Sequence, residues 1–526
     1  MMDMVVKLPS VNPVILVCTA LLCSLAFLYV RSRSSRHSSS DLPPSPWRLP
    51  IIGNLHQLGG SAHQSLHVLS LEHGPLMLVH FGLVPMFVVS SGELAREVLK
   101  TREVEFPGRL NTEAYRILFE GGEDKIFGPA WTQIRKVCVS EVLSLKRIQA
   151  LQFIREEELR RLADERRPPA DLSDLFLTLA STTLSRAVLG LESAEQGGGR
   201  ESNRVIGQLV REASNLLNDV VAFGAYIPAL SWLDNLRGLY RKTKRVSQAI
   251  HEFLDRVIDE RLEIRRRSEA GEGGEQETGD RKYFVDILLE LQTRKDVMGG
   301  HELTRMEIRA ILLVMFIAGI DSSVITLEQT MKELVKNPRI MRKLQQEIRS
   351  VVGNKSEIHQ SDLSRMEYLK CVVKETLRLH VPPMVTRQAS DKDSKLGGFQ
   401  IPANAAVLIN MWAIHMDPAT WDRPLEFLPE RFLNTRYDFT GQDDKYFPFS
   451  LGRRICPGVQ FAMFSIEYAL AHVLCWFDWE LPDEICAQSF GMSEDQNLPL
   501  RLVPLLHKFD GASQTIITKI KGLSNK

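Results

Sequence analysis

The stretch Phe449-Ser-Leu-Gly-Arg-Arg-Ile-Cys-Pro-Gly458, near the end of a chain of 526 residues, decides the fold. It sets one cysteine, Cys456, between glycines that permit tight turns and a close approach of the backbone. Arg454 adds a cation beside the sulfur, and the apolar run after Pro457 predicts a helix whose first amides favour a thiolate. Cys456 is therefore a candidate thiolate ligand of an iron, with Phe449 placed to shield the sulfur from water.

A cysteine in a loop is, taken alone, more often a free and partly buried thiol than a ligand. Here the whole pattern Phe-x-x-Gly-x-Arg-x-Cys-x-Gly is present, and it resembles the haem-binding signature of the cytochrome P-450 superfamily. The resemblance implies haem b with Cys456 as the axial thiolate, Arg454 on a haem propionate, and Phe449 and Gly458 lining the loop.

A second resemblance lies upstream of the cysteine. Glu375-Thr-Leu-Arg378 is similar to the family's Glu-x-x-Arg motif, and Phe427–Phe432 to the segment whose arginine, Arg431, joins that pair. Alone, a glutamate and an arginine three residues apart are an ordinary helix pair that contributes a few tenths of a kcal/mol. In the family's order they imply a buried Glu-Arg-Arg cluster that stabilises the core beside the haem.

Two further sites resemble propionate contacts. Trp131 and Arg135 are four residues apart, so ring and guanidinium share one helix face, as in the family's Trp-x-x-x-Arg pair. Without the motif order, a core tryptophan beside a solvated arginine is the more common arrangement. The resemblance also assigns Arg387 to a propionate, although the segment after His380 is shorter than in plant members of the family.

The run Ala318–Ser323, within an apolar helical stretch, resembles the distal oxygen-activation motif. The resemblance makes Asp321 and Ser322 the catalytic pair: Asp321 relays protons from solvent, and the Ser322 hydroxyl bonds to oxygen or to an ordered water. The family usually has threonine in place of Ser322, and serine lacks the methyl group that restricts the rotamer. Without the cysteine downstream, Asp321 would be a capped or salt-bridged core acid.

Patterning predicts a mainly α fold with a small β region, which is consistent with the cytochrome P-450 fold that the resemblance implies. Hairpins are expected over 76–89, with a turn at Gly82 and Pro85, and over 399–410, with a turn at Pro402. Helical spacing is expected over 308–316 and 334–348. No internal repeat or long linker divides the chain, so one catalytic domain over 51–507 and a polar tail over 508–526 are predicted.

The N-terminus predicts a membrane anchor. Residues 14–30 are apolar and uncharged, and residues 31–50 are first basic and then proline-rich. A core helix or a cleavable signal peptide are the alternatives, but the basic residues follow the apolar run. The pattern predicts a luminal segment over 1–13, a single transmembrane helix and a catalytic domain facing the cytosol, tethered to the endoplasmic reticulum.

Charge and cysteine usage exclude other classes. Lys+Arg and Asp+Glu both number 65, so no excess of positive charge suggests nucleic acid as a partner. The 7 cysteines have no spacing typical of a disulfide framework or a zinc site. Motifs such as Leu42-Pro-Pro-Ser-Pro and Ala413-Ile-His-Met-Asp-Pro resemble the plant microsomal branch of the family.

The resemblance thus implies a haem-thiolate monooxygenase that uses O2 and electrons from NADPH-cytochrome P-450 reductase. Its substrate is predicted to be an apolar small molecule, a plant specialised metabolite of terpenoid, alkaloid or phenolic type. Desaturation, ring formation or rearrangement, a reductase-independent isomerase or dehydratase, and a non-catalytic haem carrier stay open. The expected substrate contacts lie within 106–127, 311–322, 381–385 and 490–492; the expected reductase-docking cations, which could equally be a solvated face, are Arg135, Lys136, Lys146 and Arg147.

Overall fold

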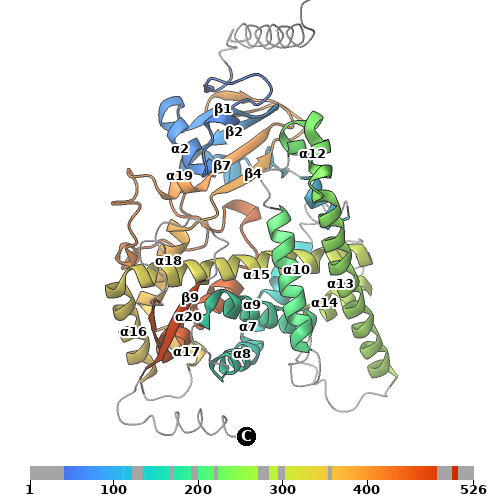
Figure 1. The fold of residues 1–526 in the computed structure, drawn as a ribbon, viewed down its shortest axis with the longest axis vertical. Helices are drawn as coiled ribbons and strands as arrows, with labels where there is room; N and C mark the ends of the chain where they lie inside the picture. The colour runs from blue at the N-terminus through green and yellow to red at the C-terminus, as the bar shows by residue number, and fades with distance from the viewer. Residues whose placement is uncertain are drawn as a thin grey trace, which may run out of the picture. The chain divides into compact units, whose positions relative to one another are not determined.

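The computed structural model describes residues 41–109, 112–120, 134–136, 138–164, 170–190, 199–217, 223–270, 283–293, 303–353, 358–481 and 500–507. Helices dominate and the strands are short, so the predicted mainly α fold with a small β region is confirmed (Figure 1). The predicted anchor over 14–30, Trp131, the turn at 490–492 and the tail over 508–526 lie outside the described residues. The chain forms two compact units, one drawn from 1–110, 222–233 and 383–414 and the other from the remainder.

The first unit contains a four-stranded sheet. Its strands stand in the order β1 (Leu76–Phe81), β2 (Val84–Val89), β7 (Ala406–Asn410) and β4 (Met384–Gln388), with β2 and β7 parallel and the other pairs antiparallel. Apolar side chains of β1, β2 and β7 pack with Leu66 of α2 (Ala62–His73) into one buried cluster. Burial of this sheet face supplies the hydrophobic stabilisation of the unit.

The hairpin β1–β2 is confirmed, with its turn at Gly82. This glycine has a φ of 60°, and a Cβ there would lie 2.6 Å from the carbonyl oxygen of Tyr226, so only glycine fits. Pro85, predicted to be part of the turn, instead lies inside β2 opposite His80. Pairing of β2 with β7 begins only at Met86, and a strand tolerates proline before it becomes central.

The predicted hairpin over 399–410 is wrong. Strand β6 (Phe399–Ile401) pairs with the preceding β5 (Ser394–Leu396), whereas β7 joins the four-stranded sheet. Gly397 and Gly398 link β5 to β6 with φ values of 56° and 86°, a left-handed conformation that favours glycine. The remaining elements of this unit are η1 (Leu55–Gln57), α3 (Gly92–Arg96), η2 (Glu97–Thr101), α11 (Phe223–Tyr226), η5 (Pro228–Leu230) and, each ending in the second unit, α12 (Ser231–Leu236) and α19 (Met411–His415).

The second unit is organised around α15 (Arg305–Lys336), which packs against α9 (Leu172–Leu189), α10 (Gly199–Leu217), α18 (Glu367–Leu379) and α20 (Val459–Trp476) (Figure 1). A capping box starts α15. The Thr304 hydroxyl accepts from the Glu307 N–H at 3.2 Å, and the Glu307 carboxylate accepts from the Thr304 N–H at 2.8 Å. Half of the most apolar 18-residue window of α15 is buried within the described chain.

The predicted helical run over 334–348 is two helices. α15 ends at Lys336, and α16 (Pro338–Val352) starts with proline in its first position. Proline disfavours the helical conformation in the residue before it, and Asn337 accordingly lies outside the helical region, with φ of −121° and ψ of 73°. The other elements of this unit are α4 (Glu113–Leu118), η3 (Cys138–Val142), α7 (Leu145–Ala150), α8 (Gln152–Asp164), β3 (Ala170–Asp171), α13 (Leu239–Glu269), α14 (Phe284–Thr293), α17 (Gln360–Leu363), η6 (Pro429–Phe432), η7 (Gly452–Arg454), β8 (Phe477–Glu480) and β9 (Arg501–Leu506).

A charged cluster lies in the core of the second unit. Arg378 and Glu375, both fully buried on α18, form two hydrogen bonds of 2.8 and 3.0 Å. Arg431 donates to the same carboxylate at 2.9 Å, as does the backbone N–H of Leu428. The third Arg378 nitrogen, Nη1, donates to the carbonyl of His415 at 2.9 Å. One carboxylate thus compensates two guanidinium groups and joins α18 to the segment 415–431.

Replacing Glu375 with glutamine should strongly destabilise the second unit. The substitution leaves two guanidinium groups buried without an anion, which typically costs about 3–5 kcal/mol of unfolding free energy. The change is measured as the urea concentration at the midpoint of the loss of circular dichroism.

Glu263 is the matched control, because it also accepts from two arginines, Arg266 and Arg267, but on the exposed face of α13. Glu263→Gln should leave the midpoint unchanged. Equal effects of the two substitutions would show that burial of the Glu375 cluster contributes nothing to stability.

Candidate active site

The cysteine loop is closed by backbone hydrogen bonds. The N–H of Cys456 donates to the carbonyl of Phe449 at 2.9 Å, and Ser450 donates to Phe447 at 2.9 Å. Ser450 and Gly452 both have a φ of 72°, so the chain turns sharply twice before the cysteine. α20 begins at Val459, three residues after Cys456. The thiol therefore lies next to the amide end of a long helix, where a negative charge is stabilised.

The thiol of Cys456 is accessible. Cys456 is only half-buried, whereas Cys138, Cys371 and Cys475 are buried; none of these four cysteines forms a disulfide within the described chain. A Cβ at Gly458 would lie 3.9 Å from its sulfur, so the glycine leaves that side of the thiol uncovered. Burial raises the pKa of Cys138 and of Cys475 to about 12, which keeps those thiols protonated and poor ligands.

Two arginines accompany the loop. Arg135 lies on the helical turn 134–136 and donates to the carbonyl of Ile455, directly before the cysteine. Arg454 is half-buried within the loop itself. Phe449 packs edge-on against Phe439, with 5.3 Å between ring centroids. A thiol, a helix N-terminus and two guanidinium groups form a donor set that suits an iron thiolate and acidic propionates.

An open stripe runs along α15 in the same unit. Most of the middle of this helix is buried, yet Ala318 and Ser322 are exposed. Val314, Met315 and Ile325 continue the stripe at helical spacing and are half-buried. An apolar stripe left open on a core helix is a surface that a flat apolar group and an apolar ligand can cover.

Ser322 and Asp321 differ in their surroundings. The Ser322 hydroxyl donates to the carbonyl of Ala318 at 2.6 Å, which fixes its rotamer and leaves its lone pairs facing outward as acceptors. Burial raises the pKa of Asp321, and the nearby Arg211 guanidinium and Ser214 hydroxyl only partly offset that effect. An acid with a raised pKa beside an acceptor hydroxyl can hold a proton and deliver it.

Sequence reasoning missed three residues around Asp321. Arg211 and Ser214 come from α10, which carries no recognisable motif. Glu328 lies seven residues after Asp321, on the same face of α15; burial raises its pKa, and Arg211 lies 3.8 Å from its carboxylate. The seven-residue spacing of Asp321 and Glu328 was a detectable signal.

Two assigned residues are not placed with Cys456. Arg387 lies on β4 of the first unit, 2% exposed, with Nη1 donating to the carbonyl of Thr386 at 3.1 Å. Trp131 lies outside the described residues. Their roles at the haem propionates remain predictions.

Comparison with known proteins decides the family. The chain matches the Cytochrome P450 family model over residues 43–496. The chain belongs to the cytochrome P450 family. It is a monooxygenase with a haem-thiolate iron cofactor.

Relatives of this cytochrome P450 include plant enzymes. Cytochrome P450 71A1 of Persea americana is 41% identical over 92% of this chain and 97% of its own. Phenylacetaldehyde oxime monooxygenase of Prunus mume is 40% identical over 92% and 94%, and indoleacetaldoxime dehydratase of Arabidopsis thaliana is 40% identical over 84% and 87%. A zebra fish cytochrome P450 solved with progesterone matches with a TM-score of 0.70 at 25% identity, over 85% of this chain and 100% of its own.

The residues present fit the haem that the family carries. Cys456 would hold the iron through its thiolate, and Arg135 and Arg454 would face the propionates. When bound, the haem supplies the activation of dioxygen for insertion into unreactive bonds.

Replacing Asp321 with asparagine should stabilise the protein at neutral pH. A raised pKa means that the folded protein holds the proton more tightly than the unfolded chain. Stability is therefore lost as the pH rises from the ordinary aspartate pKa, about 4, through the raised value. The stability of Asp321→Asn relative to wild type should thus increase from acid to neutral pH, measured as the unfolding temperature across that range.

Asp255 on α13 is the control, because its pKa is shifted in the opposite direction. Although burial raises its pKa, hydrogen bonds from Arg305 and Arg309 outweigh that effect and lower it. Asp255→Asn should therefore be less stable than wild type at neutral pH, with the deficit shrinking toward acid. A pH-independent difference for Asp321→Asn would contradict the raised pKa.

Proposed function

We propose that this cytochrome P450 oxidises an apolar small molecule, a plant specialised metabolite, with O2 and with electrons from an NADPH-dependent reductase. The open stripe on α15 carries the proposal, because it presents apolar side chains beside Ser322 and Asp321 in the unit that also holds Cys456. The stripe binds and orients the substrate and excludes water. Ser322 accepts a hydrogen bond from water or from a protonated oxygen, and Asp321 resupplies the proton.

The uncharged stripe and the substrates named for two relatives support an apolar small molecule as the substrate class. The stripe members Val314, Met315, Ala318 and Ile325 offer no charge, so a neutral ligand is favoured. The named substrates of two relatives, phenylacetaldehyde oxime and indoleacetaldoxime, combine an aromatic group with one small polar function. An arylalkyl compound of this size is the first substrate to test.

The proposal also places the enzyme on the endoplasmic reticulum. Residues 14–30 would form the single-pass anchor, with the catalytic domain over 51–507 in the cytosol. Lys136 and Lys146 are exposed and suit a docking face for the acidic surface of a reductase. Arg135 is not exposed as these lysines are, and one of its nitrogens donates to the carbonyl of Ile455.

The proximal assignment is tested by the difference spectrum of the reduced protein with and without carbon monoxide. Wild type should show the strongly red-shifted band of a thiolate-ligated haem, and Cys456→Ala should lose it. Cys371→Ala, which removes a buried free thiol, is the control and should keep the band. A red-shifted band in Cys456→Ala would overturn the assignment of the ligand.

Removing the Ser322 hydroxyl should divert electrons from product to peroxide. Loss of one hydrogen bond, about 1–1.5 kcal/mol, changes the partition between the two outcomes about tenfold. Ser322→Ala should therefore raise the peroxide formed per NADPH, measured with an arylalkyl substrate and reductase.

Ser322→Thr is the matched control, since threonine keeps the hydroxyl and can form the same bond to Ala318. It should leave the ratio of product to NADPH at or above the wild-type value. Equal uncoupling in both variants would assign the effect to packing on α15 and remove the hydroxyl from the mechanism.

A second candidate function is dehydration of an aldoxime to a nitrile and water. The relative named indoleacetaldoxime dehydratase favours it. The reaction breaks an N–O and a C–H bond and consumes no net electrons, so it needs neither O2 nor a continuous supply of NADPH.

Phenylacetaldoxime distinguishes the two functions. A monooxygenase should consume about one NADPH per product and lose product with Ser322→Ala, because it depends on proton delivery to oxygen. A dehydratase should form nitrile at the same rate when O2 is removed from the reduced enzyme. The nitrile is quantified by mass spectrometry, with and without O2, and its yield is compared with the amount of NADPH consumed.

A further inference from the structure

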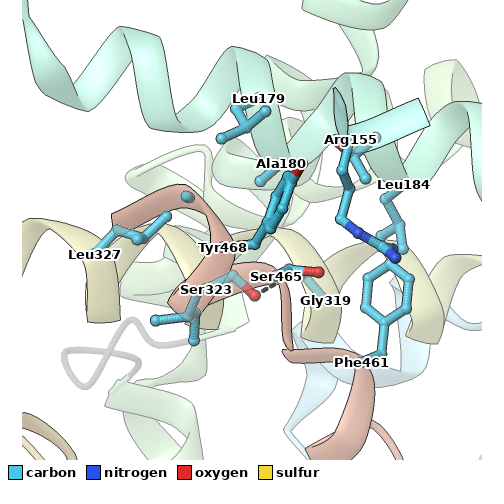
Figure 2. A pocket seen from close by; sticks show the side chains of 13 residues that line it. Arg155, Leu179, Ala180, Leu184, Gly319, Ser323, Leu327, Phe461, Ser465 and Tyr468 are labelled. Atoms are coloured by element: carbon cyan, nitrogen blue, oxygen red, sulfur yellow. Dashed lines mark hydrogen bonds between the residues drawn. The ribbon is translucent and has the colours of Figure 1, made fainter. Parts of the chain in front are cut away.

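A small cavity lies behind the oxygen-activation segment of α15. It is lined by side chains of α8, α9, α15 and α20, which Figure 2 shows. Gly319 and Ser323 line it from α15 and flank Asp321 and Ser322 in the sequence, whose side chains do not line it. Its volume of about 30 Å³ accommodates one small ion or one or two waters and excludes an organic substrate.

Arg155 of α8 is the charged group of this cavity. Its side chain is 2% exposed and lies near the ring of Phe461 on α20 (Figure 2). The guanidinium carbon is 5.9 Å from the centroid of that ring and 4.7 Å from the centroid of Phe464, also on α20. Nη2 donates to the carbonyl of Ile148 at 2.5 Å. Nε and Nη1 are buried and form no hydrogen bond with any residue that the structure describes.

Two hydroxyl groups that line the cavity are likewise buried without a hydrogen-bond partner. Thr183 Oγ1 on α9 and Ser465 Oγ on α20 are buried and have no hydrogen-bond partner within the described chain. Ser323 differs, because its hydroxyl donates to the carbonyl of Gly319 at 2.8 Å. Two guanidinium nitrogens and two hydroxyl groups therefore belong to side chains that line one cavity, and none of the lining residues is acidic.

The other buried arginines of this unit show what Arg155 lacks. Arg186 pairs with Glu158 at 2.7 Å, Arg261 with Asp286 at 2.6 Å and Arg378 with Glu375 at 2.8 Å. Arg155 has no such carboxylate among the described residues. An uncompensated buried charge strongly destabilises a fold, so a counter-ion is required.

Burial lowers the pKa of Arg155 to about 10, and the neighbouring Tyr468 and Glu156 offset this only in part. The guanidinium is therefore still charged at neutral pH, although it is poorly solvated. Its interaction with the Phe464 ring contributes about 2 kcal/mol and satisfies no N–H group. A water in the cavity could accept one of these hydrogen bonds but would bring no charge.

We propose that the cavity binds one monatomic anion, chloride under physiological conditions. Arg155, Thr183 and Ser465 donate to it, and the anion joins α8, α9 and α20 behind the turn of α15 that carries Ser322. This site is independent of the substrate and the haem ligand. Its predicted effect is chloride-dependent stability of the holoenzyme.

The first test compares the unfolding temperature of the haem-loaded, full-length enzyme in sodium chloride and in sodium gluconate at equal ionic strength. Wild type should unfold about 2 °C higher in chloride, because an anion that binds only the folded state stabilises it. Arg155→Met, which preserves much of the side-chain volume, should abolish the difference. Arg245→Met, which removes a charge whose side chain is 77% exposed, should keep it.

The second test is direct and covers the case in which Arg155→Met fails to fold. Crystals of the holoenzyme grown in sodium bromide should show an anomalous peak within hydrogen-bond distance of the Arg155 guanidinium. The double variant Thr183→Val, Ser465→Ala retains Arg155 and should weaken that peak. No bromide peak in wild type, or a chloride effect that persists in Arg155→Met, would overturn the proposal.

Discussion

The buried Glu375 carboxylate is the interaction on which the catalytic unit depends. Arg378, held by it, donates to the carbonyl of His415, and the ring of His415 accepts from the N–H of Phe447 at 3.2 Å. Phe447 is the carbonyl partner of Ser450, which starts the cysteine loop. A continuous series of hydrogen bonds therefore runs from one carboxylate to the backbone that positions Cys456. A metal ligand is held in place by contacts of this kind beyond its own loop.

The helix α15, by contrast, leaves one of its faces uncovered. Its long apolar sequence would bury every face, yet the second unit leaves one stripe open at Ala318 and Ser322. Ser322 and Thr326 donate to carbonyls one turn back, at 2.6 and 2.8 Å. These bonds satisfy the hydroxyl protons without recruiting another element, so the open face stays polar at one point and apolar elsewhere.

The sequence was most informative where only a few residue types can adopt the required backbone conformation. The glycines around Cys456, and the spacing of Glu375 and Arg378, specify a loop and a helix pair that need no knowledge of distant elements. Prediction was wrong at 399–410, because a strand's partner depends on which sheet has a free edge, and local turn residues do not encode that choice.

Arg155 and Arg211 lie in helices without a motif. Their importance comes from the elements packed on them, and single-sequence patterning does not contain that information. Arg211 interacts with Asp321 and Glu328 only because α10 packs on α15. Arg155 lines a cavity only because α8 packs against α20. Both are ordinary helical arginines until tertiary packing removes their water.

Buried charges are therefore compensated to different degrees beside α18 and beside α15. Beside α18, each buried guanidinium has a carboxylate or carbonyl partner, which favours one rigid arrangement around the cysteine. Around the turn of α15 at residues 318–323, burial raises the pKa of Asp321 and lowers that of Arg155. Groups with incompletely compensated charge gain most from a proton or an ion, so they bind and release such partners readily. Incomplete compensation of charge thus distinguishes the surroundings of α15 at residues 318–323 from the fully paired cluster of α18.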